Sequence, residues 1–180
     1  MDQTRPIPSE FYSSDTQAPI EHCLMCGADL LHDESEYFIE RVFRRVPSMN
    51  IVEPLFEFAI CMDCASNMRQ DLSTESKKRV EEYFIQNARL RMDEEEKLNR
   101  CLLSGKEINE CAEFSLHAHC RGTNLVESIF PYAISDFAMD EIASLLSQET
   151  IDELDRFKGK YFTGPPELAD LINPKRLLPL

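Results

Sequence analysis

The sequence lacks several features that mark particular classes of protein. No apolar run in its 180 residues approaches the roughly 20 residues that cross a bilayer. Its first residues contain no basic segment followed by an apolar one, so no secretory signal is expected. It has five glycines, and none of them stands in a phosphate-binding pattern such as GxGxxG or GxxxxGK. We therefore expect a cytoplasmic protein with no membrane segment and no nucleotide loop of these kinds.

Positive charge is also scarce, with 19 Lys and Arg against 33 Asp and Glu and a formal net charge of −14. Proteins that bind DNA or RNA need a basic surface to replace the counterions of the phosphates. The two local basic clusters, at 41–45 and 77–79, have acidic neighbours, which favours a solvated face of mixed ion pairs. Nucleic acid is therefore an unlikely partner. Such binding would require the two clusters to come together.

What the chain does contain is cysteine, seven in all, and an odd number argues against a disulfide framework. Four of the cysteines form two CxxC pairs, Cys23 with Cys26 and Cys61 with Cys64. Chance would place about 0.3 such pairs in this composition. Two CxxC corners can close a tetrahedron of sulfur around one metal ion and leave no open coordination position. We predict one structural Zn²⁺ per chain, bound by these four residues.

Two alternatives remain for the paired cysteines: a CxxC redox couple, or unliganded thiols packed as small apolar groups. A second metal site is a further possibility, because His117 and His119 would lie on the same face of a strand. Cys101, Cys111 or Cys120 would have to complete such a site. The simpler expectation is that both histidines line the polar face of a half-exposed strand, with Cys120 in the core.

The order of elements around the four cysteines resembles that of the treble-clef and zinc-ribbon-like zinc finger superfamily. The first CxxC lies in a turn, and the residues at 36–46 and 54–60 are rich in the aromatic and β-branched types of strands. The second CxxC then opens a helical pattern that ends near residue 72. The resemblance covers about 23–72 and implies a zinc knuckle, a β-hairpin and a helix whose first turn holds the last two ligands.

The second half of the sequence repeats the first. CLMCGADL at 23–30 matches CLLSGKEI at 101–108, and residues 54–76 align without a gap to 128–150. This alignment places Cys101, Ser104, Ser135 and Ala138 at the positions of the four predicted ligands. The second copy would therefore lack the metal, and Ser135 would become the N-cap of its helix.

The predicted fold class is α+β, with two tandem treble-clef-like modules joined by a long amphipathic helix, the second module being degenerate. The C-terminal segment is expected to contain a short helix over 166–172. Its apolar Leu177, Leu178 and Leu180 are expected to dock on the body or on another chain. The expected divisions are a flexible N-terminal lead (1–20), a zinc module (21–75), a connecting helix (76–100), a degenerate copy (101–163) and a Pro-rich tail (164–180).

These features predict a zinc-stabilised module that acts through contact with another protein, with homo-oligomers possible and no catalysis. The alternative function is a thiol switch, in which oxidation of the CxxC pairs releases zinc. Nucleic-acid binding is a third and weaker hypothesis.

Overall fold

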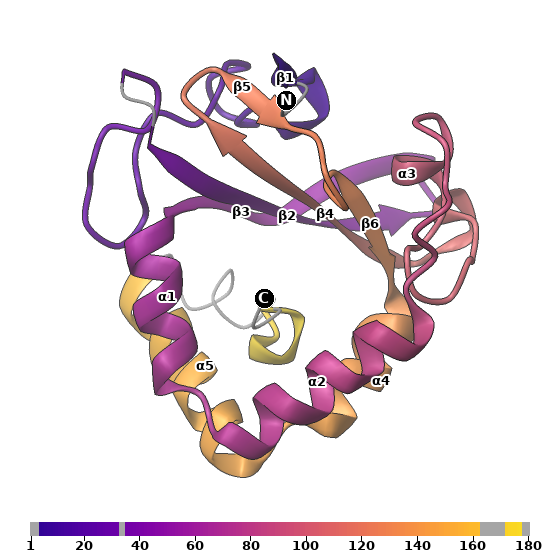
Figure 1. Ribbon diagram of the computed structural model, residues 1–180. Coiled ribbons are helices and arrows are strands. Elements are labelled where there is room, and N and C mark those ends of the chain that lie inside the picture. Colours follow the sequence, from indigo (N-terminus) through magenta and orange to yellow (C-terminus); the bar gives the residue numbers. More distant parts are fainter. Residues whose placement is uncertain (1–3, 33–34, 163–171, 178–180) are drawn as a thin grey trace.

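The computed structural model describes residues 4–32, 35–162 and 172–177, and its architecture is mixed α/β (Figure 1). Within these described residues, an antiparallel sheet of six strands is accompanied by five α-helices. The strands are β1 (Thr4–Pro6), β2 (Glu36–Val46), β3 (Ile51–Cys61), β4 (Glu113–Arg121), β5 (Asn124–Val126) and β6 (Tyr132–Ser135). The helices are α1 (Met62–Asp71), α2 (Thr74–Asn87), α3 (Glu96–Asn99), α4 (Asp136–Leu145) and α5 (Gln148–Tyr161). Three short 3-10 turns are η1 (Ser9–Phe11), η2 (Ile108–Glu110) and η3 (Pro174–Arg176).

Strands from both halves of the sequence form one sheet, in the order β1-β5-β4-β2-β3, with β6 also paired to β4. The strand predicted over 36–46 is confirmed with the same bounds, and the one predicted over 54–60 is longer, at Ile51–Cys61. The central contact is the antiparallel pair of β2 and β4, in which Glu40 lies opposite His117. Because this pairing is non-local, it places side chains from the two halves next to each other.

The helices α1, α2, α4 and α5 lie on one side of the sheet (Figure 1). The turn between α1 and α2 contacts the turn between α4 and α5. The hydroxyl oxygens of Ser73 and Ser147, one from each turn, lie 2.8 Å apart. Each of these serines also caps its following helix by accepting a backbone N–H bond, from Ser76 and from Thr150. The same residue type therefore starts both helices and joins them.

The described N-terminal residues 4–20, which were expected to be a flexible lead, lie on the side of the sheet that faces away from the helices and include β1 and η1 (Figure 1). Ile7 is buried and Phe11 is fully buried, which gives this segment an apolar anchor. The Arg41 guanidinium donates to the Glu10 carbonyl at 2.5 Å, and the backbone N–H of Ser14 donates to Glu57 at 2.6 Å. Composition alone did not reveal these tertiary contacts.

The helix expected to run over 76–100 is shorter, because α2 ends at Asn87 and only the single turn α3 follows. The backbone N–H of Arg89 donates to the Leu102 carbonyl at 2.9 Å. This bond to a distant segment replaces the bond that would continue the helix. The sequence from residue 88 onward has helical propensity, but tertiary contact overrides it.

The described part of the C-terminal segment packs on the chain itself. Leu177 is fully buried and Ile172 is buried. The Arg176 guanidinium donates to Glu113 at 2.9 Å and to Asp140 at 2.6 Å, which fixes η3 against β4 and α4. The helix expected over 166–172 lies almost entirely outside the described residues, and so do Leu178 and Leu180. Among the described residues, no helix has the length and apolar character needed to cross a membrane.

Candidate metal centre

The four predicted ligands come together at one end of the β2–β3 hairpin. Cys23 and Cys26 lie in the turn before β2, Cys61 ends β3, and Cys64 lies in the first turn of α1. All four Sγ atoms lie within 4.8 Å of one another, and those of Cys26 and Cys61 are 3.8 Å apart. A tetrahedral ion with Zn–S bonds of about 2.3 Å requires sulfurs about 3.8 Å apart. The four cysteines are therefore close enough to bind one metal ion.

The backbone explains why the first pair lies against the second. Gly27 has a φ of 71°, a conformation that costs other residues energy, and its N–H donates to the Cys23 carbonyl at 2.9 Å. The N–H of Cys23 donates to Ala28 at 2.9 Å, which closes the turn. The N–H of Leu24 donates to the Ala59 carbonyl of β3, also at 2.9 Å. This last bond holds the turn beside the strand that delivers Cys61.

The thiols differ in their acidity. Burial raises the pKa of Cys23, but the backbone amides of Cys26, Cys61 and Met25 donate to its sulfur and bring the pKa down to about 7. Burial is the main cause of a raised pKa at Cys61 and at Cys64, and neighbouring thiols raise the pKa of Cys64 further. Four adjacent thiolates repel one another, so full deprotonation requires a cation among them. Soft sulfur ligands in a closed set suit zinc.

The residues of the second half that the sequence alignment predicted at the ligand positions form a hydrogen-bonded group. The Ser104 and Ser135 hydroxyl oxygens lie 2.9 Å apart, and Cys101 Sγ accepts the Ser104 N–H at 3.4 Å. Ser135 is the N-cap of α4, as predicted, and accepts the N–H of Ala138 at 3.2 Å. Among the described residues, the only cluster able to hold a metal is the set of four cysteines in the first half.

The other candidate residues lie apart from that cluster. His117 is buried, so the expected half-exposed polar face of β4 is wrong at this position. Its Nε2 lies 2.8 Å from the Ser115 hydroxyl, whereas His119 Nε2 lies 3.0 Å from Glu36. Cys111 and Cys120 are fully buried. Cys120 therefore packs in the core, as expected.

The basic side chains at 41–45 form ion pairs and hydrogen bonds with other groups of the same chain. Arg41 pairs with Glu57 at 2.8 Å, and Arg44 pairs with Glu53. The Arg45 guanidinium donates to the carbonyls of Cys111 and Ile108, both at 3.2 Å. The sequence indicated mixed ion pairs here but gave no sign that Arg41 is buried, because its partner lies on the neighbouring strand.

Comparison with known proteins gives no further information on the site. The chain matches no family model, no curated protein and no solved structure.

Proposed function

We propose that the protein binds one Zn²⁺ through Cys23, Cys26, Cys61 and Cys64 and acts through contact with another protein. The observation that carries the metal part of this proposal is the cluster of four Sγ atoms within 4.8 Å of one another. Four thiolates would hold the ion in a closed shell with no position for a reactive water. The ion would therefore stabilise the fold and take no part in chemistry.

The order of elements supports a treble-clef-like first module, because the last two ligands lie at the N-cap and in the first turn of α1. Equal backbone bonds support an internal duplication. The N–H of Leu24 bonds to Ala59, and the N–H of Leu102 bonds to Ala133, in both cases at 2.9 Å. Gly27 and Gly105 have nearly the same φ, 71° and 72°. Ser73 and Ser147, the N-cap residues of α2 and α5, are a further pair that occupies the same position in both halves.

A partner surface is offered by the tip of the β2–β3 hairpin. Met49, Ile51 and Val52 are 66%, 41% and 43% exposed, and they are neighbours in the sequence. A cluster of exposed apolar side chains at a hairpin tip is typical of a contact site. A photo-crosslinking amino acid in place of Met49 is expected to form one discrete adduct with the partner protein. The substitution Ile51→Asp is expected to abolish this adduct. The same residue at the exposed Gln70 of α1 is the control.

The metal proposal is tested by metal content and stability of the protein purified without added metal. We expect one zinc per chain in the wild type, none in Cys23→Ser, and one in Cys101→Ser, its matched control in the second half. Zinc at 1,000 times its dissociation constant stabilises a fold by about 4 kcal/mol. That equals a rise of about 8–16 °C in Tm for a chain of this size. Equal zinc in both variants, or none in the wild type, would contradict the proposal.

The alternative of a thiol switch has one observation in its favour. Cys26 is exposed, and its Sγ lies 3.8 Å from that of Cys61. Peroxide would take two electrons from this pair, forming one S–S bond and water and releasing the metal. Release of zinc by mild peroxide, with recovery after reduction, would favour the switch. Retention of zinc under the same treatment would favour the structural role.

A further inference from the structure

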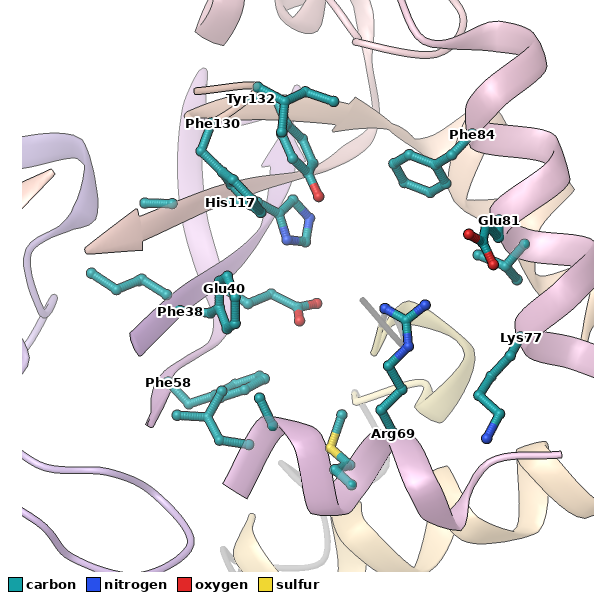
Figure 2. A pocket seen from close by; sticks show the side chains of 17 residues that line it. Phe38, Glu40, Phe58, Arg69, Lys77, Glu81, Phe84, His117, Phe130 and Tyr132 are labelled. Atoms are coloured by element: carbon teal, nitrogen blue, oxygen red, sulfur yellow. The ribbon is translucent and has the colours of Figure 1, made fainter. Parts of the chain in front are cut away.

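A cavity of about 330 Å³ lies between the sheet and the helices α1 and α2 (Figure 2). This volume falls within the range of small-molecule sites. Residues from both halves of the chain line it, and its described wall includes none of the four clustered cysteines. The cavity is therefore a site distinct from the candidate metal centre.

Aromatic rings form a continuous part of the cavity wall. The ring of Phe130 contacts the rings of Phe38 and Tyr132, at centroid distances of 5.7 and 4.9 Å. Phe84 of α2 approaches Tyr132 edge-on, with the centroids 6.5 Å apart. These are the distances of stacked and edge-to-face ring pairs. A flat aromatic molecule in the cavity would continue this series of ring contacts.

The wall also contains a hydrogen-bond donor. Tyr132 is 3% exposed, and its hydroxyl has no hydrogen-bond partner among the residues that the structure describes. Figure 2 shows this hydroxyl turned toward the cavity, beside the ring of His117. Burial, and to a lesser extent the charge of Glu40, raise the pKa of Tyr132, so the hydroxyl keeps its proton. It can therefore donate to a ligand atom that accepts a hydrogen bond.

The charged side chains around the cavity balance one another. Two carboxylates, Glu40 and Glu81, line it together with two cations, Arg69 and Lys77. Burial lowers the pKa of His117 to about 3, so its imidazole adds no charge at neutral pH. Equal numbers of both signs do not concentrate an anion or a cation, and a buried ion would also lose its hydration. The wall therefore favours a neutral molecule.

We propose that this cavity binds a neutral aromatic molecule that carries one carbonyl oxygen. The aromatic body packs against Phe38, Phe84 and Phe130, and the carbonyl oxygen accepts a hydrogen bond from the Tyr132 hydroxyl. This bond places the carbonyl end of the molecule at the sheet, because Tyr132 belongs to β6. The proposal is independent of the metal ion and of the partner protein proposed above.

Two neutral fluorescent probes test the hydrogen bond. 6-Propionyl-2-(dimethylamino)naphthalene has an aromatic body with a carbonyl oxygen, and N-phenyl-1-naphthylamine has no oxygen. Tyr132→Phe removes the hydroxyl and keeps the ring. We expect it to weaken the carbonyl probe about fivefold, equivalent to about 1 kcal/mol, and to leave the other probe unchanged. Tyr83→Phe, in α2 and outside the described cavity wall, is the matched control and should change neither.

A further variant tests the location of the probes. Val80 is buried and lines the cavity, so Val80→Phe should fill part of it and weaken both probes. Thermal unfolding shows whether this variant folds, and the two tyrosine variants decide the question if it does not.

Three results would overturn the proposal. The first is a carbonyl probe that the wild type does not bind, or that Tyr132→Phe and Tyr83→Phe weaken equally. The second is full binding of both probes by a folded Val80→Phe. The third concerns charge: 8-anilinonaphthalene-1-sulfonate, an anion with the same aromatic body as N-phenyl-1-naphthylamine, would bind more tightly than that neutral probe.

Discussion

His117 offers a stability measurement whose size follows from the structure. Its imidazole is buried under the helices, and burial lowers its pKa to about 3. An unfolded histidine has a pKa of about 6.5. Between these two values the unfolded chain binds a proton that the folded chain does not. Stability is therefore complete above pH 6.5 and is lost as the pH falls toward 3.

At pH 5.0 the unfolded imidazole is almost fully protonated and the folded one is neutral. The difference of 1.5 pH units from 6.5 corresponds to about 2 kcal/mol of unfolding free energy. For a chain of this size, with a urea m-value of about 2 kcal/mol per molar, the midpoint moves by about 1 M. His117→Gln should lose about that much less stability than the wild type between pH 7.5 and pH 5.0.

The assay is urea unfolding at the two pH values with zinc saturating, so that proton release at the thiols is common to all samples. His32→Gln is the control, because the His32 side chain is 85% exposed. It should follow the wild type. The Glu40 carboxylate opposite His117 would favour the imidazolium. If His117→Gln and the wild type lose equal stability, the native imidazole is protonated and the argument from burial fails.

Two further substitutions test how the second half and the C-terminal segment are held. Leu177→Ala should cost about 2–4 kcal/mol in urea unfolding, because Leu177 is fully buried. A loss below 0.5 kcal/mol would mean that η3 does not stay docked. Ser135→Ala should cost about 1–2 kcal/mol, because it removes both the N-cap of α4 and the contact with Ser104. No loss of stability there would show that the serine pair does not stabilise the second half.

The local elements were largely predictable from the sequence. Aromatic and β-branched residues at 36–46 predicted β2 with its observed bounds, because that pattern suits a pleated surface. The spacing of Cys23, Cys26, Cys61 and Cys64 predicted a cluster, because each CxxC places two sulfurs on one side of a turn. Ser135 was predictable as a cap for a similar local reason.

The non-local features could not be read from local patterns. Arg41 stands among charged residues and was interpreted as solvated, but its partner Glu57 lies on the next strand and both are largely buried. Phe11 lies in a segment without periodicity, yet its side chain is fully buried. A cavity of about 330 Å³ between the sheet and the helices α1 and α2 has the same origin. Glu40 and His117 meet only because β2 pairs with β4, a choice that no local signal in the sequence indicates.

The candidate metal centre and the cavity share one element, α1. Cys61 occupies the N-cap position of this helix and Cys64 lies in its first turn, so a metal ion bound there would fix where the helix starts. Ala65 and Arg69 follow at the next turns and line the cavity. An ion that holds the start of α1 would therefore also hold the stretch of backbone that carries both of these residues.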